Sequence, residues 1–143
     1  MIHKNANIEN EDIGEGTVIW AYTHICKYAL IGKNCNIGEF VHIGPGVIIG
    51  DGCKIQNYAM IPGGVEMGNN VFIGPHVCFT NDKYPDAKNR DFHPIKTYVE
   101  NEVSIGANVT ILPGIVIRSG TMIGAGAIVT KDTEMGQTIK GKW

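Results

Sequence analysis

The stretch IGKNCNIGEFVHIGPGVIIGDGCKI, residues 31–55, decides the fold, because an isoleucine returns in it at every sixth position. The same spacing runs through nearly the whole chain, with one interruption between Phe79 and Val99. A period of six matches neither the 3.6 residues of a helical turn nor separate strands joined by independent turns. We therefore predict a repeat architecture. Large apolar residues, mostly isoleucine, occupy these anchor positions: 13, 19, 25, 31, 37, 43, 49, 55, 61, 67, 73, 79, 99, 105, 111, 117, 123 and 129.

A second set of positions supports the same interpretation. The fourth residue after each anchor is small or β-branched, as at Thr17, Cys35 and Val41, with Lys83 as the exception. Glycine directly follows nine of the eighteen anchors, where a tight corner favours a residue without Cβ. Each hexad thus predicts one short strand and one corner, and successive coils should stack by parallel pairing at about 4.8 Å.

This pattern resembles the hexapeptide-repeat acyltransferases. The resemblance implies an all-β, left-handed parallel β-helix with three hexads per triangular coil. The whole chain, residues 1–143, would be one such domain, with a protruding loop at about residues 80–98.

Coils of 18 residues place residues that are 18 apart above one another. We therefore expect an outward column of His24, His42, Met60 and Cys78, and an inner stack of Cys35 and Cys53. A further outward column, made of Leu30, Ile48 and Val116, is apolar enough to need cover. A homotrimer would supply that cover, and it is how this family assembles.

Composition narrows the possible partners. The 143 residues carry a net charge of −2, which gives no electrostatic basis for binding nucleic acid or an anionic membrane. No apolar run is long enough to span a bilayer, and the N-terminal MIHKNANIENED lacks the order of a secretory signal. We expect a soluble cytoplasmic protein whose four cysteines are reduced thiols.

The interruption, FTNDKYPDAKNRDFHPIKTY at residues 79–98, adds about fourteen residues to one coil. Its many charges and two prolines exclude it from the core. Taken alone, it is an ordinary solvated excursion. In the proteins that the chain resembles, however, a loop at this coil projects over the neighbouring subunit and helps to form the active site.

Four stretches resemble a narrower group, the N-acetyltransferases that act on nucleotide-linked 3-amino sugars: VIWAYTHI, KIQNYAMIPGGV, GPHVCFTNDKYP and VTKD. The resemblance implies transfer from acetyl-CoA to a sugar amine during surface polysaccharide biosynthesis. It places Asn81 beside the reacting amine, and Asp82 near a sugar hydroxyl or the ammonium. His76 is a weaker candidate for a base that reaches across a subunit boundary. Gly63 departs from the group, where a glutamate is common.

The resemblance also implies where acetyl-CoA binds. Small residues at matching positions of late coils would line the pantetheine groove, and Ala107 and Ala125 are 18 apart. Thr130 and Lys131 would lie near the nucleotide end, where the lysine offers a charge to a phosphate.

Other functions stay open. A sugar O-acetyltransferase of this fold needs a general-base histidine, and Tyr84 stands at that position. A zinc enzyme of this fold needs three converging histidines, whereas Asn81 follows His42 and His76, so we expect no metal. A trimeric scaffold without catalytic activity is the remaining alternative.

Overall fold

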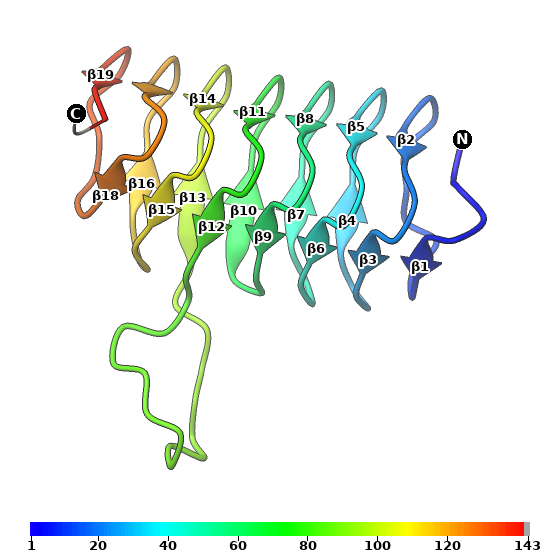
Figure 1. Ribbon diagram of the computed structural model, residues 1–143, viewed down its shortest axis with the longest axis horizontal. Coiled ribbons are helices and arrows are strands. Elements are labelled where there is room, and N and C mark those ends of the chain that lie inside the picture. The colour runs from blue at the N-terminus through cyan, green and yellow to red at the C-terminus, as the bar shows by residue number, and fades with distance from the viewer. Residues whose placement is uncertain (142–143) are drawn as a thin grey trace.

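The computed structural model describes residues 1–141 and confirms an all-β, left-handed parallel β-helix (Figure 1). Strands of two or three residues alternate with tight corners along the described chain. They are β1 (Asn7–Ile8), β2 (Val18–Ile19), β3 (His24–Ile25), β4 (Leu30–Ile31), β5 (Asn36–Ile37), β6 (His42–Ile43), β7 (Ile48–Ile49), β8 (Lys54–Ile55), β9 (Met60–Ile61), β10 (Val65–Met67), β11 (Phe72–Ile73), β12 (Cys78–Phe79), β13 (Thr97–Val99), β14 (Ser104–Ile105), β15 (Thr110–Ile111), β16 (Val116–Ile117), β17 (Met122–Ile123), β18 (Ile128–Val129) and β19 (Thr138–Ile139).

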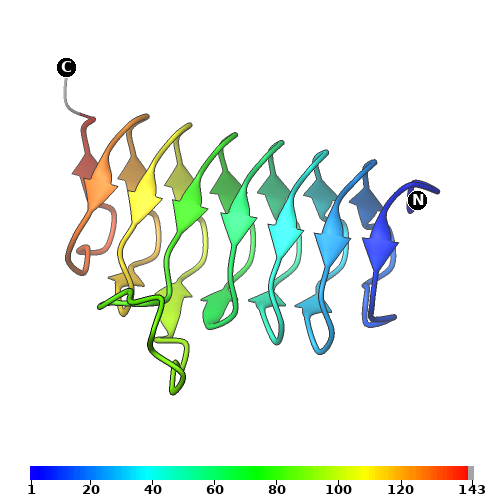
Figure 2. The same cartoon turned by 60° about the horizontal axis from the view of Figure 1, so that its bottom comes forward.

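Three parallel sheets form the sides of a prism. From β2 to β18 every third strand joins the same sheet, and β1 and β19 join the sheets of β3 and β17. The orders are β1-β3-β6-β9-β12-β15-β18, β4-β7-β10-β13-β16 and β2-β5-β8-β11-β14-β17-β19. Figure 2 shows the coils stacked from the N-terminal end to the C-terminal end. Ile19 pairs with Ile37, and Ile37 pairs with Ile55, which confirms the predicted stacking of residues that are 18 apart.

The predicted anchors fill the inside of this prism. Ile19, Ile37 and Ile55 are fully buried, as are most of the other anchors. The small residues that follow them are buried as well, and Thr17 and Thr23 donate their hydroxyl protons to the carbonyls of Gly32 and Gly38 at 2.7 and 2.6 Å. The core is therefore a stack of isoleucine layers in which each buried hydroxyl has a partner.

The predicted columns are confirmed. His24 pairs with His42, His42 with Met60, and Met60 with Cys78 along one sheet. Cys35 and Cys53 are buried free thiols. Two further residues lie in this outward column between Ile48 and Val116. Glu66 follows Ile48 at the usual offset of 18, whereas Tyr98 follows Glu66 at an offset of 32 because the loop lies between them.

The end coils were not predicted. β1 pairs with β3 at an offset of 17, with Asn7 beside His24, and β19 pairs with β17 at an offset of 16, with Thr138 beside Met122. These offsets fall outside the six-residue period, so the anchor pattern does not extend to either strand.

The interruption lies outside the prism. Glu66 pairs with Tyr98, which are 32 apart, so this coil holds fourteen residues more than the usual 18, as predicted. Residues 80–96 form a loop that projects from the side of the prism (Figure 1). The predicted range is corrected at its end, because Thr97 and Tyr98 belong to β13. Residues 1–141 form no helix of the length and apolar character that crossing a membrane requires.

Candidate active site

The projecting loop, residues 80–96, is fastened at its base by backbone and side-chain hydrogen bonds. Its two arms meet where the Ile95 N–H donates to the Asn81 carbonyl at 3.0 Å. The Asn81 side-chain amide donates to the Gly63 carbonyl at 2.8 Å, and the Thr80 hydroxyl donates to the Ile111 carbonyl at 2.8 Å. The loop therefore leaves the prism in a defined direction, although most of its residues are exposed.

Two glycines of the preceding coil lie under this base. Gly64 has φ +103°, and a Cβ there would come within 3.0 Å of the Ile95 carbonyl oxygen. The Gly63 carbonyl accepts the hydrogen bond from Asn81. Gly63, which stands where a glutamate is common in the amino-sugar group, therefore lies beneath the loop that forms one wall of the site.

A cleft of about 770 Å³ opens between the loop and the later coils. One wall is the start of the loop, a second is the corner after β15, and a third is the corner after β18. The lining residues are Thr80, Asp82, Lys83, Pro85, Leu112, Pro113, Gly114, Ile115, Thr130, Lys131 and Asp132. Residues from three consecutive coils therefore meet in one concave site, which is typical of small-molecule binding.

Three of the predicted site residues share this cleft: Asp82, Thr130 and Lys131. Asp82 also accepts the Tyr84 N–H through Oδ1 at 3.1 Å, which fixes the first turn of the loop. Asn81 lies at the base of the loop, and within residues 1–141 its Oδ1 has no hydrogen-bond partner. The Asn81 side chain therefore donates through its Nδ2 to Gly63, and its Oδ1 is available as a hydrogen-bond acceptor in the described chain.

The other three predicted residues lie on a different edge of the prism. His76, Ala107 and Ala125 occupy the corners before β12, β15 and β18, whereas the loop and cleft occupy the corners after these strands. His76 is exposed, with φ +59°, and its ring stacks on Tyr58 at 4.9 Å. Within one chain, the two groups flank opposite borders of the same sheet.

Eight residues of the cleft were not singled out from the sequence as site residues: Thr80, Lys83, Pro85, Leu112, Pro113, Gly114, Ile115 and Asp132. Thr80 stands in the quoted FTN motif, which could have revealed it. Asp132 has a structural contact, since its Oδ1 accepts the Val116 N–H at 2.8 Å. Lys83 brings a second lysine to the cleft beside Lys131. No short-range sequence pattern links Pro113 to the loop. Pro113 lies beside the loop because it follows β15, which is one coil further along the prism.

Tyr84, which stands where a base histidine is found in O-acetyltransferases, does not line the cleft. Its ring is exposed, and the Lys83 ammonium lies 5.6 Å from the ring centroid. Carboxylate, hydroxyl and ammonium groups of the described chain therefore line the cleft, and no imidazole does. Such a site suits orientation and charge stabilisation better than proton abstraction from a hydroxyl.

Repeats, prism and loop together define a class of protein. Residues 12–45, 28–62, 46–81 and 96–131 match the family described as bacterial transferase hexapeptide (six repeats). The unmatched residues 82–95 fall within the projecting loop. The chain belongs to this hexapeptide-repeat transferase family.

Among sequence relatives, the chain is 46% identical over 132 residues to dTDP-3-amino-3,6-dideoxy-alpha-D-galactopyranose 3-N-acetyltransferase of Aneurinibacillus thermoaerophilus. This match covers 92% of the chain and 69% of the relative. A galactoside O-acetyltransferase of Lactococcus lactis is 41% identical over 70 residues, which cover 46% of the chain and 34% of that protein. The first relative thus matches the loop-bearing coil and nearly all the others.

Among solved structures, the acetyltransferase domain of PglB from Neisseria gonorrhoeae in complex with acetyl coenzyme A is similar to the chain. The TM-score is 0.71 at 19% identity, over 98% of the chain and 53% of that protein. At this identity the likeness shows the fold alone.

Proposed function

We propose that the protein transfers the acetyl group of acetyl-CoA to the amine of a nucleotide-linked amino sugar, with a 3-amino sugar as the substrate class. The sugar amine attacks the thioester carbonyl carbon, the carbon–sulfur bond breaks, and the departing CoA sulfur takes the surplus proton of the nitrogen. The products are the N-acetylated sugar and CoA with a free thiol. An amine that is partly unprotonated near neutral pH needs no protein base for this attack.

The observation that carries the proposal is the composition of the cleft. It is lined by two carboxylates, two lysines and two threonine hydroxyls, and Asn81 stands at the base of the loop that forms one of its walls. The 46% identity to a dTDP-3-amino-sugar N-acetyltransferase supports the same substrate class. A hydroxyl acceptor would require a general base, and within one described chain the cleft contains no histidine, so only the partner subunit's His76 could serve as one.

Each residue has a role in this proposal. The Asn81 Oδ1 accepts a hydrogen from the sugar amine and so aims the nitrogen lone pair, while its amide stays bound to the Gly63 carbonyl. Asp82 holds a sugar hydroxyl or the incoming ammonium. Lys131 pairs with a phosphate of the nucleotide part of CoA, and Thr130 donates a hydrogen bond beside it.

A homotrimer is part of the proposal. His76, Ala107 and Ala125 occupy one edge of the prism, and the cleft occupies the next edge. A threefold arrangement can place the first edge of one copy against the second edge of its neighbour, which would complete a groove for pantetheine. His76 would then face the cleft from a neighbouring subunit, as a polar contact near the acceptor.

The assay combines purified protein, acetyl-CoA and a panel of nucleotide-linked amino sugars, each paired with its hydroxyl counterpart. We expect release of CoA thiol and gain of one acetyl group by mass only with the amino sugars. Turnover of the hydroxyl members at equal or higher rates would overturn the choice of acceptor. Failure to bind acetyl-CoA in calorimetry would leave the scaffold as the better interpretation.

Variants test the residue roles. We expect Asn81→Ala to lower kcat roughly 100-fold to 1,000-fold, the loss typical of one positioned polar group. Lys131→Ala should raise the KM for acetyl-CoA and leave kcat nearly unchanged. Lys88→Ala is the matched control, because Lys88 is an exposed loop lysine that does not line the cleft. Wild-type turnover in Asn81→Ala would remove that residue from the mechanism.

A further inference from the structure

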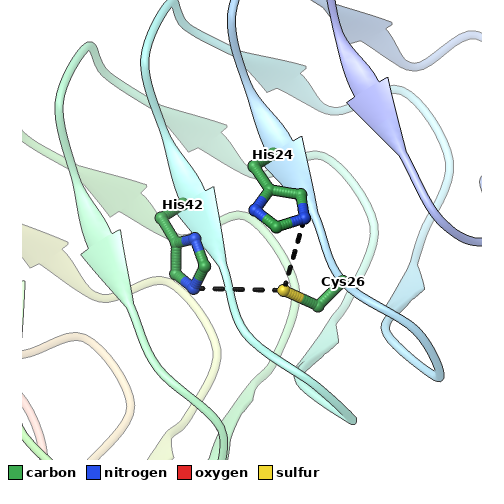
Figure 3. A group of neighbouring side chains, drawn as sticks. All are labelled: His24, Cys26 and His42. Atoms are coloured by element: carbon green, nitrogen blue, oxygen red, sulfur yellow. Dashed lines mark hydrogen bonds between the residues drawn. The ribbon is translucent and has the colours of Figure 1, made fainter.

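Three side chains of types that can bind a metal ion converge near the N-terminal end of the prism. His24 comes from β3, His42 comes from the adjacent strand β6, and Cys26 follows β3 directly. In Figure 3 the two imidazole rings and the thiol point toward one another. The cluster lies on coils far along the chain from those that form the cleft, so the proposed acetyl transfer does not use it.

The separations fit a common ion. The Cys26 Sγ lies 3.8 Å from His24 Nε2 and 4.0 Å from His42 Nε2, and all three donor atoms lie within 4.8 Å of one another. Zinc binds thiolate sulfur at about 2.3 Å and imidazole nitrogen at about 2.0–2.1 Å. Tetrahedral angles then place sulfur and nitrogen about 3.5 Å apart and the two nitrogens about 3.4 Å apart. The two sulfur–nitrogen separations need shifts of only a few tenths of an ångström, and rotation of the two partly exposed imidazoles would close the remaining separation.

Both contacts of the Cys26 sulfur are long and weak as hydrogen bonds. The thiol can donate to only one of the two Nε2 atoms, and the other contact needs the sulfur as a weak acceptor. Cys26 is only 8% exposed, while both histidines are partly exposed.

A fourth group adds negative charge. The Glu9 Oε1 lies 2.7 Å from His24 Nε2, and Glu9 Oε2 accepts the Lys27 N–H at 3.3 Å. A cysteine thiolate together with this carboxylate would balance the two charges of a divalent cation. That balance reduces the cost of holding the ion in a partly buried position.

We propose that His24, Cys26 and His42 form a binding site for one zinc ion per chain, with Glu9 as the neighbouring anion. Binding forms bonds from zinc to the two Nε2 atoms and the Cys26 Sγ. The Cys26 thiol proton passes to solvent, and His24 binds as the neutral imidazole with its ring proton on Nδ1, which leaves Nε2 to the ion. Because β3 and β6 belong to successive coils, the ion ties the N-terminal coils together. The expectation of no metal rested on the lack of metal-ligand spacing among the cysteines and of three converging histidines, and neither criterion covers two histidines with one cysteine brought together by the pairing of β3 with β6.

The test is metal titration of the full chain, after chelator treatment, with Zn²⁺ and with Co²⁺ as a spectroscopic probe. We expect one ion per chain and a sulfur-to-cobalt charge-transfer band with tetrahedral ligand-field absorption. Zn²⁺ should also raise the melting temperature, since it binds the folded state. Cys26→Ser and His42→Gln should each lower the affinity more than tenfold, and Cys26→Ser should abolish the charge-transfer band. Glu9→Gln should weaken binding less than either ligand substitution does, because it removes only a neighbouring negative charge.

Cys78→Ser is the matched control, because Cys78 lies in the same outward column of the sheet, two coils from His42. It should retain the wild-type affinity and spectrum. A charge-transfer band that survives Cys26→Ser, or equal affinity in wild type and Cys26→Ser, would overturn the proposal. The metal-free melting temperatures of the variants show whether they fold, and acetyl transfer is a separate readout on which this test does not depend.

Discussion

At the scale of single residues, the corners decide whether the coils can stack. A Cβ at Gly50 would lie 2.6 Å from the carbonyl carbon and oxygen of Gly68 in the next coil, so this glycine permits a close backbone approach. Gly46 is glycine for another reason. Its φ is +70°, and nothing lies within 4 Å of the position of a Cβ.

These two glycines give a paired prediction. Gly50→Ala should lower the free energy of unfolding by about 1–3 kcal/mol, because the new methyl group forces the two backbones apart. Gly46→Asn should change it by less than about 0.5 kcal/mol, since asparagine tolerates this backbone region. Urea denaturation followed by circular dichroism measures both. A larger loss in Gly46→Asn than in Gly50→Ala would contradict the packing argument.

Asparagine and aspartate side chains at other corners join one coil to the next. The Oδ1 atoms of Asn57, Asn69 and Asn101 accept backbone N–H groups of the preceding coil at 3.0, 2.8 and 2.7 Å. These bonds satisfy donors that the short strands leave free. Polar corner residues that resemble ordinary surface positions in the sequence therefore have a structural role.

At the scale of elements, the projecting loop is an addition to a coil that is complete without it. β13 pairs with β10 and β16 as any other strand of its sheet does. An ion pair between Lys96 and Glu66 at 3.0 Å and the base hydrogen bonds fasten the loop, but the core anchors on both sides are buried without its help. The loop therefore forms one wall of the candidate site, whereas the prism contains the core that stabilises the fold.

Removal of the loop tests this separation. Deleting residues 81–94 shortens the step from Phe79 to Val99 from twenty residues to six, which restores the 18-residue coil. We expect a folded β-helix with a strand-rich circular dichroism spectrum and no detectable acetyl transfer to amino sugars. Transfer at the wild-type rate would exclude the loop from the site. An unfolded product would show that the loop stabilises the coil.

At the scale of the whole molecule, an apolar column remains uncovered in the single chain. Leu30 and Ile48 are 45% and 39% exposed, and Tyr98 lies further along the same sheet at 39%. Exposed apolar columns of this kind are typical of protein interfaces. They support the proposed homotrimer.

A charged substitution in this column tests assembly of the trimer without disturbing the fold of the single chain. Ile48 pairs with Glu66, so Ile48→Lys places a cation beside a carboxylate and should leave the monomer folded. In the proposed interface, the same charge should shift the trimer to a monomer in sedimentation velocity. Phe72→Lys on a different sheet is the control and should remain trimeric. Dissociation of the control, with Ile48→Lys intact, would place the interface on the other sheet.

Much of the fold could be predicted because its information is local and periodic. The anchors at every sixth position define the core, and the 18-residue coil follows from three of them, so His24 above His42 and Cys35 above Cys53 were expected correctly. β1 and β19 were missed because offsets of 17 and 16 leave no repeating signal.

The sequence by itself determined the isoleucine core, the inward and outward faces, and the position and length of the added loop, because each depends on spacing along the chain. Only the tertiary structure decided which residues meet. Thr80, Asp82, Thr130 and Lys131 share one cleft, His76 lies on another edge, and Cys26 joins His24 and His42. These groupings depend on the side of each corner from which a side chain projects and on the path of the loop, and neither is set by the period.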